Sequence, residues 1–230
     1  MEDLRSARRR GRRERDKRQA AFRSAHALSQ IGAAAIPPLL EALKDDDDSL
    51  RIGAAKALGG MGPIAVEAVP ALIANFTHEE EAVRREMIEA VGLLGPAAKP
   101  ALLELLRAPH ALARTSAALA LGEMGKPAAD AVPVLLEQYG REKDPSVRGS
   151  ILTALPKAGA SADKTVPILV DALNDSDEGV RRSATNALLL LRNDAPKIVA
   201  ALNRHLVGSD PVIRQRAAYV LGRLGSVAAS

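Results

Sequence analysis

An arginine returns along this chain at a nearly constant spacing. It stands at six positions: Arg51, Arg84, Arg114, Arg148, Arg181 and Arg214. The gaps between them are 33, 30, 34, 33 and 33 residues. Each Arg opens the same phrase, in which small residues lead to Ala, Leu and usually Gly. A fixed period in the thirties indicates a solenoid, in which each repeat is one supersecondary unit that stacks on its neighbours.

Two helical phrases alternate within each repeat. The first places Pro shortly before a Leu-rich run, near Pro37, Pro70, Pro100, Pro133 and Pro167, with Ile198 in the equivalent place of the last unit. Pro suits the first turn of a helix, because its missing N–H has no intrahelical partner there. The second phrase follows the Arg, and its apolar residues fall at −1, +3, +4, +7 and +10, which is helical spacing. We therefore predict six helix pairs at 36–60, 63–94, 97–124, 128–158, 162–191 and 194–224.

Short acidic turns join the two phrases, at 45–48, 79–81, 144–145, 175–178 and 210–211. Asp in these turns is expected to cap the following helix. The six repeated Arg residues are expected to pair with Asp in an Asp–Arg ladder between layers. Glycine closes the second phrase as a helix C-cap at Gly62, Gly95, Gly125, Gly159 and Gly225. Arg192 replaces that Gly in one unit and Ala111 interrupts the acidic turn in another, so both places are expected to be irregular.

Composition limits the core and the compartment. Apolar residues make up 47% of the 230 residues, mostly Ala, Leu and Val, which permits close helix packing. The chain has no Cys, which excludes disulfides and thiolate metal sites. No run approaches 18 uninterrupted apolar residues, and the basic N-terminus is not followed by an apolar stretch, so we expect a cytoplasmic protein without a membrane span. The oligomeric state stays open.

Positive charge is concentrated at the N-terminus. Residues 1–23 hold ten Lys and Arg against four Asp and Glu, whereas the remainder holds 22 against 24. The basic residues of this segment are Arg8, Arg9, Arg10, Arg12, Arg13, Arg15, Lys17 and Arg18. Such a segment can bind nucleic acid or another anionic surface by counterion release, or it can serve as a solubilising tail or helical extension. An unpaired helix containing Phe22 and Ile31 is expected to follow it and to cover the N-terminal end of the stack.

The repeated unit resembles HEAT repeats, most closely the phycobilisome-lyase-like class. The resemblance rests on Pro-x-Leu-Leu, the acidic turn and Val-Arg-x-x-Ala-x-x-Ala-Leu-Gly, and covers about residues 20–225. It implies an all-α, right-handed α-α superhelix, with the Pro-type helices on the convex wall and the Arg-type helices on the concave wall. We accordingly divide the chain into a basic segment at 1–18 and a single solenoid at 19–230.

Specificity should lie where the repeats differ, on Arg-type helix positions outside the apolar stripe. The predicted partner-binding residues are Lys56, Arg85, Glu89, Leu93, Leu119, Glu123, Thr153, Lys157, Arg182, Asn186, Leu190, Tyr219 and Arg223. Apolar residues rimmed by charges, such as Leu93, Leu119 and Leu190, suit a protein or peptide partner, although a merely solvated face has the same composition. The main functional prediction is a non-enzymatic interaction scaffold.

An enzymatic role is the alternative that the resemblance leaves open. Hydroxylases built on HEAT repeats hold two irons with recurring His-Glu pairs, whereas this chain has one such pair, His78-Glu79, in a turn. A metal site needs several converging ligands, so we expect neither a metal nor a cofactor. A bilin-lyase-like or other accessory activity and nucleic-acid binding through the basic segment remain as alternatives.

Overall fold

The computed structural model describes residues 27, 30–207 and 211–225. This part of the chain consists of helices and short turns, with no strand among the described residues. It divides into two compact units, with the boundary between Ala98 and Lys99. The prediction of one continuous solenoid over 19–230 stays a prediction. The basic segment and the expected helix around Phe22 lie outside the described residues, apart from Ala27, Gln30 and Ile31.

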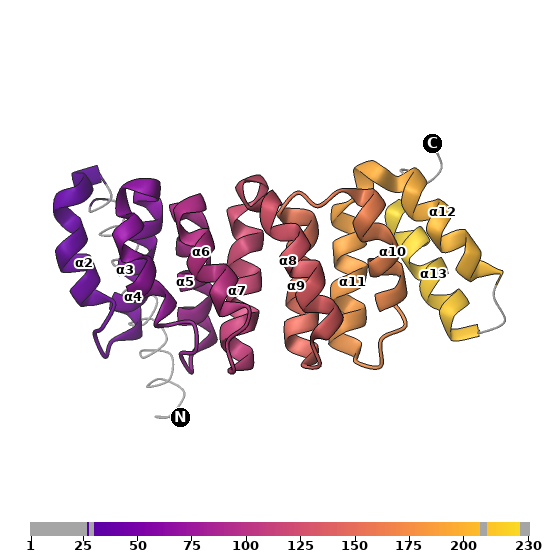
Figure 1. Ribbon diagram of the computed structural model, residues 1–230, viewed down its shortest axis with the longest axis horizontal. Helices are drawn as coiled ribbons and strands as arrows, with labels where there is room; N and C mark the ends of the chain where they lie inside the picture. Colours follow the sequence, from indigo (N-terminus) through magenta and orange to yellow (C-terminus); the bar gives the residue numbers. More distant parts are fainter. Residues whose placement is uncertain (1–26, 28–29, 208–210, 226–230) are drawn as a thin grey trace, which may run out of the picture. The chain divides into compact units, whose positions relative to one another are not determined.

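Each unit is built from helical hairpins in which a Pro-type helix precedes an Arg-type helix (Figure 1). The Pro-type helices are α2 (Ile36–Ala42), α4 (Val69–Ile73), α6 (Lys99–Leu105), α8 (Val132–Arg141), α10 (Ala162–Ala172) and α12 (Ala195–Leu206). The Arg-type helices are α3 (Asp48–Met61), α5 (Glu81–Leu94), α7 (Ala111–Met124), α9 (Pro145–Lys157), α11 (Glu178–Leu190) and α13 (Pro211–Leu224). The six predicted pairs and the all-α solenoid class are thereby confirmed.

Short 3₁₀ segments lead into most of the Pro-type helices. They are η1 (Gly32–Ala35), η2 (Gly62–Ala68), η3 (Pro96–Ala98), η4 (Lys126–Ala131) and η5 (Arg192–Asp194). The hairpin of α10 lacks such a segment. Its helix begins at Ala162, directly after the N-cap Ser161, so Pro167 lies inside the helix rather than in its first turn. Only α10 therefore departs clearly from the predicted position of proline at the helix start in the part of the chain that the structure describes.

Small residues allow the Arg-type helices to approach one another closely. In the first unit α3 packs on α5, and a Cβ added at Gly59 would lie 3.0 Å from the Cα of Ala90. In the second unit α7, α9, α11 and α13 pack in succession, and a Cβ at Gly122 would lie 3.0 Å from the Cα of Ala154. Gly59 and Gly122 share the same register, eight residues after the repeated Arg. This contact is therefore a repeated device of the fold.

Caps at the turns set where the Arg-type helices begin and end. Asp47, Asp144 and Asp177 accept hydrogen bonds from backbone N–H groups of the first helical turn, as predicted. Ala111 does not disturb its turn, because the neighbouring His110 uses Nδ1 to accept from the Leu112 N–H. The expected irregularity there is therefore wrong. The expected irregularity at Arg192 is confirmed, because α11 ends at Leu190 and its C-cap Leu191 lacks the positive φ that Gly62, Gly95 and Gly125 adopt.

One segment, Asp48–Ile73, is long and apolar enough by composition to suggest a membrane span. In the structure it comprises three separate elements, α3, η2 and α4, rather than one helix. Gly62 ends α3 with a φ of +59°, and Ala65 has non-helical backbone angles within η2. Many of its apolar residues, including Leu58 and Leu72, are buried in the core of the first unit. We therefore interpret the segment as core.

Candidate functional site

The repeated Arg side chains donate hydrogen bonds to the turn that precedes their own helix. Arg114 uses Nη1 to donate to the carbonyl oxygens of Ala108 and Pro109, at 2.9 and 2.8 Å. Arg181 donates in the same way to the carbonyls of Asp175 and Ser176, both at 2.9 Å. These acceptors lie six and five residues before the Arg, and Arg84 uses the same two positions. In these three repeats the recurrence of Arg therefore has a structural cause.

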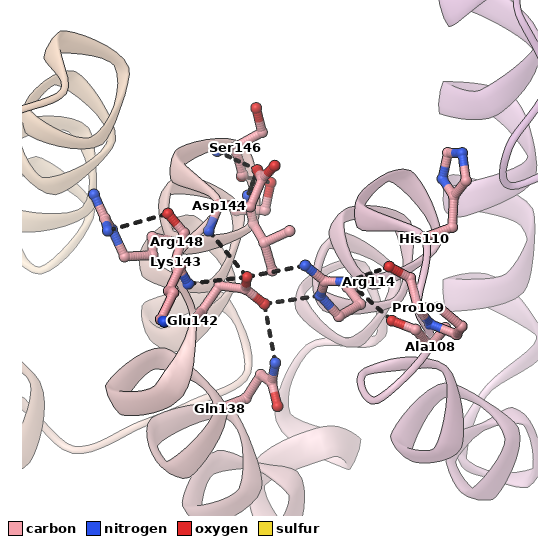
Figure 2. Close-up of polar contacts among 12 residues, drawn as sticks. Ala108, Pro109, His110, Arg114, Gln138, Glu142, Lys143, Asp144, Ser146 and Arg148 are labelled. Atoms are coloured by element: carbon pink, nitrogen blue, oxygen red, sulfur yellow. Dashed lines mark hydrogen bonds and ion pairs between the residues drawn. The ribbon is translucent and has the colours of Figure 1, made fainter.

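Arg114 also reaches the next repeat (Figure 2). Its Nε and Nη2 donate to the two carboxylate oxygens of Glu142, at 2.8 and 2.9 Å. Glu142 further accepts from Gln138 Nε2 at 3.0 Å and from the Asp144 N–H at 3.0 Å. Burial acts to raise the pKa of Glu142, but the hydrogen bonds from Arg114, the Asp144 N–H and Gln138 outweigh it and lower the pKa to about 2. Glu142 is therefore ionised at neutral pH.

The same contact joins the next two repeats. Arg148 Nη2 donates to Asp175 Oδ1 at 2.8 Å. Both acceptors, Glu142 and Asp175, stand six residues before the following repeated Arg, and each also accepts from the N–H two residues later. Arg114 and Arg148 thus each contact a carboxylate of the following repeat, which is Glu142 at one joint and Asp175 at the other. His78 occupies this position after Arg51, so the first unit places no carboxylate there among its described residues.

Most of the predicted partner-binding residues are exposed on the Arg-type helices. The exposed ones are Arg85, Glu89, Leu93, Glu123, Lys157, Arg182, Asn186, Leu190, Tyr219 and Arg223. Lys56, Leu119 and Thr153 are partly buried. Leu119 was expected to be an exposed apolar residue, and its side chain is instead partly buried. We name the exposed surface of the Arg-type helices the Arg-helix face. It consists of the surface of α3 and α5 in the first unit and of α7, α9, α11 and α13 in the second.

Ion pairs link neighbouring repeats on this face. In the second unit Lys157 Nζ lies 2.6 Å from Glu123 Oε1, and in the first unit Lys56 Nζ lies 3.2 Å from Glu86 Oε2. Glu86 is buried, with 8% of its surface exposed. That burial raises the pKa of Glu86, and the contact with Lys56, which lowers it, only partly offsets the effect. Glu86 is not among the predicted site residues, because its position in the repeat does not indicate that the carboxylate is buried.

Two hollows open on the Arg-helix face of the second unit. The larger, which we name the α11–α13 groove, has a volume of about 550 Å³ and is lined by Arg181, Arg182, Arg216, Arg223, Glu178 and Tyr219, among others. The smaller has a volume of about 270 Å³ and lies over α9 and α11, lined by hydroxyl-bearing residues such as Ser150, Thr153 and Ser183. Arg182 borders both hollows. Arg182, Tyr219 and Arg223 were predicted as partner-binding residues, whereas the positions of Arg181 and Arg216 in the lining of this groove were not predicted.

Metal-ligating residue types are scattered in the structure. Within the described ranges, no three His, Asp or Glu side chains converge as they would around a metal ion. His78 lies 3.5 Å from Asp48 and accepts from the Glu80 N–H, and His110 is the helix cap already described. These two histidines thus have local structural contacts.

Comparison with known families identifies the repeat. A family model described as HEAT repeats matches residues 4–81, 69–156 and 166–230. A search of curated protein sequences found no match. The phycobilisome-lyase-like subclass remains a prediction.

Solved structures with a similar fold are distant in sequence. YibA of Escherichia coli is 19% identical, with a TM-score of 0.53, and the match covers 87% of this chain and 73% of that one. An archaeal HEAT-like repeats protein from Thermococcus onnurineus NA1 is 18% identical with a TM-score of 0.45, covering 93% and 97%. An engineered protein is 19% identical with a TM-score of 0.41, covering 84% and 97%. At 19% identity, the match to YibA indicates a similar fold alone.

Proposed function

Because this chain belongs to the HEAT-repeat family, we propose that it is a non-enzymatic scaffold that binds a protein or peptide on its Arg-helix face. The observation that carries the proposal is the contrast between the two kinds of position on the Arg-type helices. The repeated Arg, Gly and Ala residues are used by the turns and the core. The exposed positions differ from repeat to repeat and are left available to a partner.

Exposed apolar side chains on this face support the proposal. Leu93, Leu190 and Tyr219 have 53%, 54% and 55% of their surface exposed. Charged side chains accompany them on the same helices, including Glu89, Arg182 and Arg223. Apolar residues with a charged surround are the usual composition of a protein interface, in which the apolar part provides binding energy and the charged part provides specificity.

Site-specific photo-crosslinking tests the proposal. A photoreactive amino acid is placed at Leu93 or Leu190 on the Arg-helix face, and at the exposed Glu104 or Glu137 on Pro-type helices as the matched control. Each full-length variant is irradiated in lysate of the source cells, and adducts are identified by mass spectrometry. We expect the same discrete protein to be crosslinked from Leu93 or Leu190 and not from the control positions. Adducts formed only from Glu104 or Glu137 would place the binding surface on the other layer and contradict the proposal.

Nucleic-acid binding through residues 1–18 is a second function that one observation favours, namely the concentration of positive charge in this segment. Neutralising the segment by Arg→Gln substitution in the full chain should abolish binding to a duplex DNA or RNA probe. Binding by the unaltered chain should weaken steeply between 50 and 200 mM salt, as counterion release requires, where roughly six or more phosphate contacts lose about a thousandfold or more. Binding that survives neutralisation would contradict this function.

A further inference from the structure

The α11–α13 groove is unusual in its charge. Four guanidinium groups line it, two from α11 (Arg181 and Arg182) and two from α13 (Arg216 and Arg223). Glu178 is the carboxylate among its lining residues, so the groove carries an excess of three positive charges. Outside residues 1–23 the chain as a whole, with the groove included, holds 22 Lys and Arg against 24 Asp and Glu. This local excess therefore belongs to the groove and not to the general composition.

None of these four arginines forms an ion pair with a carboxylate in the described part of the chain. Arg181 donates to two backbone carbonyls, and Arg216 Nη1 donates to the carbonyl oxygen of Leu173 at 2.9 Å. Arg223 Nη1 donates to the hydroxyl of Tyr219 at 3.1 Å, with its guanidinium 5.9 Å from the centre of that ring. Neutral acceptors thus orient three of the side chains without neutralising their charge.

The repeats before this groove provide the contrast. Arg114 and Arg148 stand at the same register as Arg181, and each is neutralised by a carboxylate from the following turn, Glu142 or Asp175. The residue that occupies that register after Arg181 is Gly208, which has no side chain to supply a carboxylate. The sequence therefore has no carboxylate at the register that would supply the ladder acceptor for Arg181.

We infer that the α11–α13 groove binds an acidic peptide segment of the partner, in which Asp or Glu carboxylates pair with Arg182 and Arg223. This inference rests on the proposed scaffold function and specifies its partner. Guanidinium groups bind carboxylates through two parallel hydrogen bonds, which gives both affinity and orientation. The amide side chains of Asn186 and Gln215 also line the groove and offer donors and acceptors to a peptide backbone.

The second hollow favours an extended peptide over a single small anion. It adjoins the groove at Arg182 and continues over α11 to α9. Packed helices lie roughly 8–10 Å apart, and an extended chain spans about 3.3 Å per residue, so about three residues cross each helix. About six residues would therefore occupy both hollows. Glu178 and Asp177 also line this surface, and a peptide can place neutral residues opposite them, whereas every phosphate of a nucleic acid is charged.

Fluorescence anisotropy with the full chain tests the inference. The probe is a fluorescein-labelled peptide of eight residues in which Ser and Glu alternate. The comparison probes carry the same label and are a peptide with Gln at each Glu position and a single-stranded DNA of eight nucleotides. We expect the Glu peptide to bind at least tenfold more tightly than the Gln peptide, and its affinity to fall as salt rises.

The variant with Arg182→Gln and Arg223→Gln should bind the Glu peptide at least tenfold more weakly. The matched control changes two exposed arginines that lie outside both the groove and the Arg-helix face, Arg107→Gln and Arg204→Gln. The control should change the affinity by less than twofold, and thermal melting should show that both variants remain folded.

Three results would overturn the inference. These are equal affinity for the Glu and Gln peptides, unchanged affinity of the groove variant for the Glu peptide, or tighter binding of the DNA that is lost in the groove variant. The crosslinking from Leu93 and Leu190 reports separately on the scaffold function. Retained crosslinking without affinity for the Glu peptide would therefore reject the acidic-peptide inference alone.

Discussion

Arg114 and Glu142 form a two-pronged ion pair across 28 residues of sequence, with both donor–acceptor distances below 3 Å. Both side chains are largely buried, with 15% and 5% of their surfaces exposed. The pair joins the turn before α7 to the end of α8, because Arg114 also donates to the carbonyls of Ala108 and Pro109. The ion pair therefore links two successive repeats through side chains, in addition to the packing of their helices.

The Glu142 carboxylate should make stability depend on pH in the acidic range. Its pKa is about 2 in the folded protein, below the ordinary value of 4.5. A lowered pKa means that the ionised group stabilises the fold above pH 4.5, and that this contribution is lost as pH falls from 4.5 towards 2. Melting temperatures between pH 7 and pH 2 should therefore fall less steeply for Glu142→Gln than for the unaltered protein. Parallel curves would contradict the ion-pair assignment.

Glu86 should have the opposite pH dependence. Burial raises its pKa above 4.5, with Glu89 adding to the effect and Lys56 and Arg85 opposing it. The folded protein therefore holds the proton more tightly, and the ionised carboxylate lowers stability at neutral pH. Glu86→Gln should raise the melting temperature at pH 7, and the difference should shrink as pH approaches 4.5. A lower melting temperature at pH 7 would show that the contact with Lys56 outweighs burial.

Gly122 tests the close packing of the Arg-type helices. The Cβ of an alanine there would lie 3.0 Å from the backbone Cα of Ala154, so Gly122→Ala should lower the free energy of unfolding by about 1–3 kcal/mol. Gly222 has the same register in α13 and meets no atom within 4 Å among the described residues. Gly222→Ala should therefore stabilise the protein by about 0.5–1 kcal/mol, since Ala is the better helix former. Urea denaturation measures both, and equal effects would contradict the packing argument.

Arg148 tests whether the ladder stabilises the fold. Arg148→Ala removes the bond to Asp175 at 2.8 Å and leaves a carboxylate with 14% exposure without its partner. We expect a loss of about 1–3 kcal/mol in the free energy of unfolding. Arg141→Ala is the control, because Arg141 pairs with Glu137 within one helix and both are exposed; its effect should be below about 0.5 kcal/mol. A similar melting temperature for the two variants would argue against a stabilising ladder.

Local patterns were sufficient to predict the helices, the turns and their caps. Helical periodicity placed the six hairpins within a few residues, and Asp47, Asp144 and Asp177 cap helices as their chemistry indicates. These features depend on residues close in sequence, so a short window contains the necessary information. The error at Ala111 has the same origin, because the neighbouring His110 supplies a cap that the pattern of acidic turns did not include.

The partners of side chains across repeats were decided only by the tertiary structure. The spacing of Arg114 and Arg148 predicted a ladder, but packing of successive hairpins determined that Glu142 and Asp175 accept their hydrogen bonds. The burial of Glu86 and Leu119 likewise depends on neighbouring helices. The α11–α13 groove combines arginines from two repeats, and none of them forms an ion pair with a carboxylate among the described residues. Sequence determined the repeat because helix and turn formation are local, whereas burial, ion pairing and the groove arise from contacts between residues distant along the chain.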